Sequence, residues 1–137
     1  MPETASRLSV TVTQVDATPT SRAAIRSHET LIDRPEAKGG LDRGPMGGEL
    51  LLAALGGCFM SNLIAAAAAR NVPARALSVT VEGALASAPP RFEMIELTVH
   101  AEGADAAVLD KLVEISERAC IVANTLGAAV SLKIRRA

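Results

Sequence analysis

A run of twenty residues without a single charge, residues 50–69, constrains the fold of this 137-residue chain more than any other feature. The run lies between Glu49 and Arg70 and consists largely of Leu and Ala, which are strong helix formers. An acid at its start and a base at its end also suit the helix macrodipole. We therefore expect one long helix over residues 49–70 that is apolar on nearly every face.

Twenty uncharged residues also have the length of a membrane span, so two environments compete for this helix. Many of its side chains are Ala, Gly, Ser or Asn, which are weakly hydrophobic, and strand-like sequence flanks it on both sides. It is also the sole such segment in the sequence. We expect the buried central helix of a globular protein, or a helix shared with a second subunit, and no membrane.

Strand-period patterns flank the helix, and the predicted strands are residues 8–15, 25–32, 77–85, 94–101 and 130–134. We interpret the first two as a hairpin. Residues 34–48 are rich in Gly and Pro, which predicts a loop. Residues 104–120 have helical spacing of apolar side chains, and a short apolar segment follows them. The predicted order is β-β-α-β-β-α-β, an α+β fold in a single domain over residues 1–137.

The composition excludes several classes of function. The chain is 49% hydrophobic and 21% charged, as expected of a globular protein. A net charge of -1 and only two aromatic residues argue against nucleic-acid binding. His28 and His100 lack metal-ligand spacing to a cysteine, so we expect no metal. The segment Met1 to Thr4 lacks a basic and then apolar signal, so we expect a cytoplasmic protein.

The two cysteines carry most of the functional information. Cys58 lies within the uncharged run, and Cys120 ends the predicted amphipathic helix. Such a pair can be two inert small hydrophobic residues, or a reactive thiol and its resolving partner. Composition alone leaves both alternatives open.

The sequence around each cysteine resembles a known family. Gly-Gly-Leu-Asp-Arg-Gly-Pro over residues 39–45, followed by Glu-Leu-Leu-Leu-Ala-Ala-Leu-Gly-Gly-Cys over residues 49–58, resembles the signature of the OsmC/Ohr superfamily. These are the osmotically inducible and organic hydroperoxide resistance proteins. Cys-Ile-Val-Ala-Asn-Thr-Leu over residues 120–126 resembles their second-cysteine motif, and Arg26-Ser27-His28 leading to Asp33-Arg34-Pro35 resembles their second strand. The resemblance extends from Arg26 to the C-terminus.

This resemblance implies an OsmC-like fold, an intertwined homodimer with a long central helix from each subunit packed against curved antiparallel sheets. It implies a peroxidase in which Cys58 attacks an organic hydroperoxide and Cys120 resolves the sulfenic acid as a disulfide. An external dithiol such as a lipoyl group then regenerates the thiols, and no other cofactor is needed. The resemblance also implies an arginine and a glutamate that assist the first cysteine, and Arg26 and Glu49 are the candidates for these roles.

The reaction of Cys58 with a peroxide requires its thiolate form, which limits where the assisting residues can lie. An ordinary thiol is mostly protonated at neutral pH, and burial in an apolar helix disfavours the thiolate further. Because the helix holds no cation, we expect one from elsewhere, with Arg26 as first choice and Arg22 in reserve. Glu49 precedes Cys58 by nine residues, about 13 Å along a straight helix and on its opposite face. It therefore acts across a dimer interface, or the helix begins irregularly, or Glu49 only caps the helix.

Two departures from the family pattern accompany the match. Gly47 and Gly48 stand where the hydroperoxide resistance branch has a proline and its assisting glutamate, and Ile121 stands where its peroxidases commonly have proline. The alternative hypothesis is a non-catalytic OsmC-like domain that binds an apolar ligand or senses redox state through the same cysteine pair. The third hypothesis is a dimer module with a purely structural role.

Overall fold

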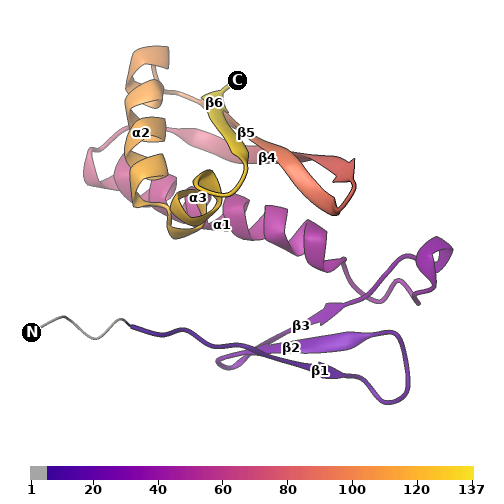
Figure 1. The fold of residues 1–137 in the computed structure, drawn as a ribbon. Helices are drawn as coiled ribbons and strands as arrows, with labels where there is room; N and C mark the ends of the chain where they lie inside the picture. Colours follow the sequence, from indigo (N-terminus) through magenta and orange to yellow (C-terminus); the bar gives the residue numbers. More distant parts are fainter. Residues whose placement is uncertain (1–5) are drawn as a thin grey trace, which may run out of the picture. The chain divides into compact units, whose positions relative to one another are not determined.

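The structure, a computed structural model, describes residues 6–137 as two compact units that meet in sequence between Leu50 and Leu51 (Figure 1). Each unit is described here by itself. The segment Met1 to Thr4, on which the expected localisation rests, lies outside the described residues. The single domain predicted over residues 1–137 stays a prediction.

The N-terminal unit is built on a small antiparallel sheet. Its strands β1 (Thr11–Gln14), β2 (Ser21–Ile25) and β3 (His28–Ile32) lie side by side in chain order. The predicted hairpin therefore differs in one respect, because residues 25–32 are not one strand. Ile25 pairs with His28, so the chain turns at Arg26, whose φ of 54° lies in the left-handed region. Glycine or asparagine usually marks such turns, and an arginine there gives no sequence signal.

A buried carboxylate organises the loop that follows β3. Asp33 accepts hydrogen bonds from the Thr20 hydroxyl at 2.7 Å and from the N–H groups of Arg34, Leu41 and Arg43. Burial raises the pKa of Asp33, but the Thr20 hydroxyl and the three N–H groups together hold this pKa below its usual range. The ionised carboxylate thus stabilises the loop above the unfolded-state pKa, and acidification through the lowered folded-state pKa removes that stabilisation.

The same loop contains a short 3₁₀ helix, η1 (Glu36–Lys38), and leads into the long helix α1 (Gly47–Ala69). The predicted helix over residues 49–70 is confirmed within two residues at its start and one at its end. In the part of the chain described, α1 alone is long and apolar enough to cross a membrane by length and composition.

The C-terminal unit combines a three-stranded sheet with helices. Strands β4 (Arg75–Ser87) and β5 (Pro90–Glu102) are antiparallel, and β6 (Ser131–Arg136) pairs with β5 in parallel. This corrects the expectation of antiparallel sheets. A parallel pair needs a long crossover, which α2 (Ala106–Ala119) and α3 (Ile121–Gly127) provide.

The α+β class is confirmed, whereas the predicted order lacked one strand and one helix. The missed strand is β2, and the missed helix is the seven-residue α3, which is too short to show a helical period.

The core of the C-terminal unit lies between α1, the sheet and α2, and it is aliphatic apart from a single buried ring. Its fully buried side chains include Leu55, Phe59, Leu63, Ile95, Leu97, Val99, Leu112 and Cys120. Gly56 brings α1 close to β4, because a Cβ at this position would lie 3.2 Å from the Val81 side chain and 3.3 Å from that of Val79. One face of the helix therefore packs on the sheet, whereas most of its other residues are exposed or half-buried, which differs from the expected helix buried on nearly every face.

Gly83 in β4 offers a test of this packing. A Cβ at Gly83 would lie 2.5 Å from Cδ1 of Phe92 and 3.3 Å from Cδ2 of Leu52. We expect Gly83→Ala to lower the free energy of unfolding by about 1–3 kcal/mol in urea denaturation, because the Phe92 ring must move. Most of this cost should vanish in a Phe92→Ala background. Equal costs in both backgrounds would show that the ring is not the cause.

Candidate functional site: a pair of thiols

Cys58 lies in the middle of α1 and its side chain is half-buried. The polar side chains one turn later bond to the helix backbone: Asn62 Nδ2 donates to the Cys58 carbonyl at 3.0 Å, and Ser61 Oγ donates to the Gly57 carbonyl at 3.0 Å. Cys58 belongs to the helix positions that pack against the core of the C-terminal unit. The helix thus presents the thiol toward this core while leaving part of it accessible.

Cys120 is fully buried and connects two helices. It is the residue between α2 and α3, with an extended backbone at φ -81° and ψ 111°. Its Sγ accepts a hydrogen bond from the N–H of Ala123 at 3.4 Å, so the sulfur itself caps the start of α3. Cys120 thus holds a place that Ser, Thr or Asp commonly occupies.

The fold brings the two free thiols together. Both cysteines belong to the same hydrophobic cluster and each influences the pKa of the other, and the start of α3, at Ile121 and Val122, also acts on Cys58. Burial raises the pKa of Cys58, but the N–H of Val122, the Cys120 thiol and the N–H of Ile121 outweigh it and lower the pKa below the ordinary value for a thiol. These donors favour the Cys58 thiolate.

The pKa of Cys120 moves in the opposite direction. Burial raises it, and the neighbouring Cys58 raises it further through its hydrogen bond and its charge, against the opposing N–H of Ala123. The first proton to leave the pair therefore leaves Cys58, and Cys120 stays a neutral thiol beside it. This asymmetry gives a nucleophile on α1 and a protonated partner between α2 and α3.

The source of this asymmetry differs from the sequence expectation. We expected that only a cation could lower the pKa of Cys58, whereas the C-terminal unit supplies backbone N–H groups. Ile121 and Val122 were not predicted as site residues, because their contribution comes from the backbone and not from the side chain. The signal available in the sequence was the short apolar segment directly after Cys120, whose first turn has free N–H groups if it is helical.

The residues predicted to assist the Cys58 thiol lie in the N-terminal unit. Arg26 is exposed in the turn between β2 and β3, and Arg22 forms an ion pair with Glu29 at 3.5 Å. Glu49 caps α1, since its Oε1 accepts the N–H of Met46 at 2.9 Å. The capping alternative for Glu49 is therefore present in the structure. A role of Arg26 or Glu49 at the Cys58 thiol stays a prediction.

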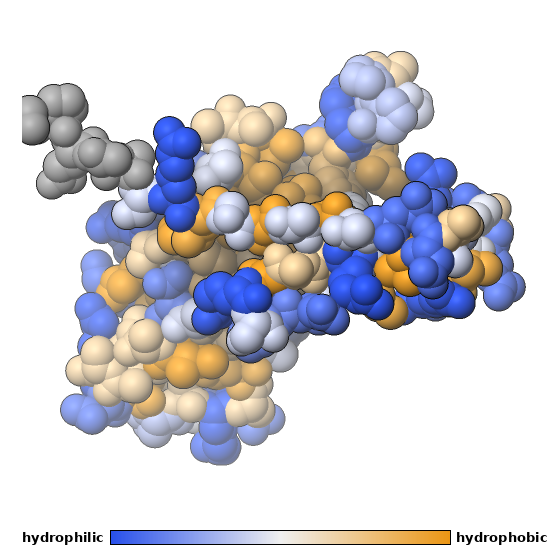
Figure 2. Space-filling view, turned by 90° about the horizontal axis from the view of Figure 1, so that it is seen from below, coloured by the Kyte–Doolittle hydropathy of each residue, from blue (hydrophilic) through white to orange (hydrophobic). Residues whose placement is uncertain are grey.

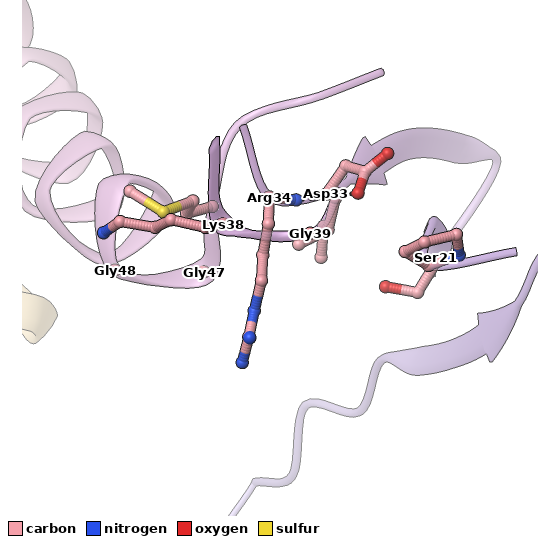
Figure 3. Close-up of a pocket in the computed structure, with 10 residues that line it drawn as sticks. Ser21, Asp33, Arg34, Lys38, Gly39, Gly47 and Gly48 are labelled. Carbon is pink, nitrogen blue, oxygen red and sulfur yellow. Dashed lines mark hydrogen bonds between the residues drawn. The ribbon is translucent and has the colours of Figure 1, made fainter. Parts of the chain in front are cut away.

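The N-terminal unit also contains a cavity of about 580 Å³, and neither cysteine lines it (Figure 3). Arg34 and Lys38 contribute two cationic side chains to its wall, and Gly47 and Gly48 at the start of α1 contribute backbone. In Figure 3 the Asp33 carboxylate points away from the Arg34 guanidinium, which agrees with its hydrogen bonds to backbone N–H groups of the loop. Pro19, Ser21 and Gly39, the first residue of the family motif, also line the cavity.

The histidines take no part in the thiol pair. His28 and His100 are both exposed, and Nε2 of His100 lies 3.5 Å from the Thr80 hydroxyl. Within residues 6–137 no group of three or more His, Cys, Asp or Glu side chains could hold a metal ion.

An α+β fold with two adjacent free thiols, whose pKa values shift in opposite directions, is the arrangement expected of a thiol redox site. Residues 39–135 match the sequence model of the family described as OsmC-like protein, so the chain belongs to the OsmC-like family. The family and the names of some structural neighbours support a redox role related to stress. No curated protein sequence gives a significant match.

Solved structures share the fold over nearly the whole chain. A hypothetical protein from Aquifex aeolicus VF5 has a TM-score of 0.82 and 19% identity, covering 97% of this chain and 96% of that one. An organic hydroperoxide resistance protein from Elizabethkingia anophelis has a TM-score of 0.77 and 18% identity, covering 99% of each chain. The organic hydroperoxide resistance protein OsmC from Legionella pneumophila has a TM-score of 0.74 and 18% identity, covering 97% and 99%.

The two pKa shifts predict an ordered pH dependence of alkylation. With limiting iodoacetamide, we expect Cys58 to react first, with a midpoint below that of an ordinary thiol. Cys120 should react only at higher pH or after unfolding. Peptide mass mapping across a pH series measures both midpoints, and unfolded protein in urea is the control. Equal midpoints in the folded protein would contradict the asymmetry.

Proposed function

We propose that this protein is a thiol-dependent peroxidase that reduces organic hydroperoxides through Cys58 and Cys120. The feature that carries the proposal is the pair of free thiols in one cluster, with the pKa of half-buried Cys58 lowered and that of buried Cys120 raised by burial and by Cys58. Membership of the OsmC-like family supports a redox role, and two structural neighbours are named organic hydroperoxide resistance proteins.

The first step is nucleophilic attack by the Cys58 thiolate on the distal oxygen of the hydroperoxide. The S–O bond forms as the O–O bond breaks, the thiolate is oxidised to sulfenic acid, and the peroxide leaves as an alcohol after taking a proton. The neutral Cys120 thiol lies beside this sulfur. Arg26 is proposed to help stabilise the thiolate or the leaving oxygen, and Glu49 to position that arginine or the substrate.

The second step resolves the sulfenic acid. The Cys120 sulfur attacks the Cys58 sulfur, a disulfide forms, and the sulfenic oxygen leaves as water with the proton from Cys120. An external dithiol, such as a lipoyl group, then reduces the disulfide by thiol–disulfide exchange. The dithiol is itself oxidised to a disulfide. No metal or organic cofactor enters this cycle, and a cytoplasmic location would keep both thiols reduced.

The surroundings of Cys58 favour an apolar substrate. The side chain of Ile121, the residue after Cys120, is 70% exposed, and the α1 stretch that carries the Cys58 thiol has no charged side chain. Organic hydroperoxides with alkyl or aryl groups would bury apolar surface there. Hydrogen peroxide has no apolar surface to bury.

We also propose that the active form is a homodimer. The N-terminal sheet buries one apolar side chain, Ala23, and leaves Leu8, Val10, Val12 and Ile25 exposed. On α1, Leu51 and Ile64 are exposed as well. Hydrophobic residues lie scattered on the face shown in Figure 2. A three-stranded sheet needs a packed face to be stable, so a second copy of this chain is the proposed cover.

Single turnover tests the peroxidase proposal. Reduced protein mixed with cumene hydroperoxide should lose two thiols per chain and yield one cumyl alcohol, faster than with hydrogen peroxide. Cys58→Ser should abolish the reaction, whereas Cys120→Ser should lose one thiol and accumulate a sulfenic acid that dimedone traps.

A rate no faster than that of an ordinary thiol with either peroxide would reject the peroxidase proposal. It would favour a redox sensor or a domain that binds an apolar ligand. Cys58→Ser with full activity would reject the site.

Sedimentation equilibrium tests the dimer proposal. At micromolar concentration we expect twice the chain mass, and Val12→Asp should shift the protein toward the monomer by placing a charge in the proposed contact. Thr11→Asp, on the other face of the same strand, is the matched control. A wild-type monomer at this concentration would contradict the proposal.

A further inference from the structure

The cavity of about 580 Å³ lies within the N-terminal unit, since the described residues that line it all fall within residues 19–48. Its volume is in the range of small-molecule binding sites. Two cationic side chains, from Arg34 and Lys38, line the cavity together with the apolar side chains of Ile32 and Met46. The wall of the cavity thus combines positive charge with apolar surface.

Neither cation has an acidic partner in the part of the chain that the structure describes. The ion pairs found there join other residues. Arg34 and Lys38 are both exposed, and Figure 3 shows the Arg34 side chain extended away from the Asp33 carboxylate. Two positive charges therefore line the cavity without an ion pair to neutralise them.

The carboxylate of Asp33 is engaged elsewhere, although Asp33 also lines the cavity. This residue is 3% exposed, and its carboxylate accepts hydrogen bonds from the Thr20 hydroxyl at 2.7 Å and from the N–H groups of Arg34 at 2.7 Å and Arg43 at 3.3 Å. These donors belong to the loop backbone and to a buried hydroxyl, and none is a cationic side chain. The guanidinium and ammonium groups at the cavity are left for an external anion.

The loop that carries both cations is fixed by its own backbone. The N–H groups of Lys38 and Gly40 donate to the Pro35 carbonyl at 2.9 and 3.1 Å, and the N–H of Asp42 donates to the Arg34 carbonyl at 3.0 Å. A Cβ at Gly40 would overlap that Arg34 carbonyl, so the chain is closely packed at this point. Because the loop is already ordered, a ligand would not have to order it on binding.

We propose that this cavity binds a small organic oxyanion, a molecule that has a carboxylate or phosphate group beside an apolar body. The planar guanidinium of Arg34 can donate two parallel N–H bonds to either group, and Lys38 adds a second positive charge. Ile32 and Met46, both half-buried, would contact the apolar body. The proposal goes beyond the peroxidase function, because neither cysteine lines the cavity.

Isothermal titration calorimetry with phenyl phosphate and with benzoate tests this site, and benzyl alcohol is the neutral probe. A buffer of about 0.1 M ionic strength screens distant charges. We expect at least one of the two anions to bind with a dissociation constant below about 1 mM, and benzyl alcohol to bind far more weakly. The tighter of the two anions identifies the ligand as a carboxylate or a phosphate.

Variants of the loop assign the binding to the cavity. Arg34→Gln and Lys38→Gln should each weaken the binding of the preferred anion by about tenfold, the loss expected for one hydrogen bond to a charged group. Arg43→Gln is the matched control, since Arg43 is an exposed cation of the same loop that does not line the cavity. This control should stay within about twofold of the wild type.

Four results would overturn the inference: no binding of either anion, equal binding of benzyl alcohol, an equal loss in Arg43→Gln, or inorganic phosphate binding as tightly as phenyl phosphate. The last result would show a site for a bare ion only. Circular dichroism checks that the variants are folded, and Lys38→Gln decides the question if Arg34→Gln is not. Because no peroxide enters this measurement, failure of the proposed peroxidase function would leave the site standing.

Discussion

The meeting of the start of α3 with the two cysteines connects the parts of the C-terminal unit that matter for chemistry. Cys120 ends α2 and caps α3 through its sulfur, while the start of α3 and the Cys120 thiol lower the pKa of Cys58 on α1. Three helices therefore meet at two sulfur atoms. Because the same turn lowers the pKa of one thiol and caps itself with the other, the geometry that closes the fold also separates the roles of the cysteines.

The rest of the unit serves to hold α1 against the sheet at this point. Gly56 allows the close approach to Val79 and Val81, and Leu55 and Phe59 fill the core on either side of Cys58 along the helix. With its neighbours packed in this way, Cys58 has little freedom to move away from α3. A thiol on a rigid helix is a better-positioned nucleophile than one on a loop.

Particular elements show why parts of the fold and site were predictable and others were not. The long helix α1 and strands β4 and β5 have regular patterns and were predicted, α1 within two residues at each end, whereas both strands extend beyond the predicted residues 77–85 and 94–101. The turn at Arg26 and the helix α3 were missed, because a positive φ at an arginine and a seven-residue helix leave no periodic trace. Cys58 and Cys120 were found through their motifs. Ile121 and Val122 were not, because a backbone N–H has no sequence signature.

The amino-acid sequence by itself determined the helix that carries Cys58, the α+β class, the absence of charge around the thiol and, through its motifs, the family. These follow from local propensity, from periodicity and from residue identity along the chain. Only the tertiary structure decided that the two thiols are neighbours and that backbone donors act on Cys58. Both depend on α1 and α3, which are more than fifty residues apart, meeting at one place. Packing and a crossover connection bring these elements together, and neither can be derived from the residues next to the cysteines.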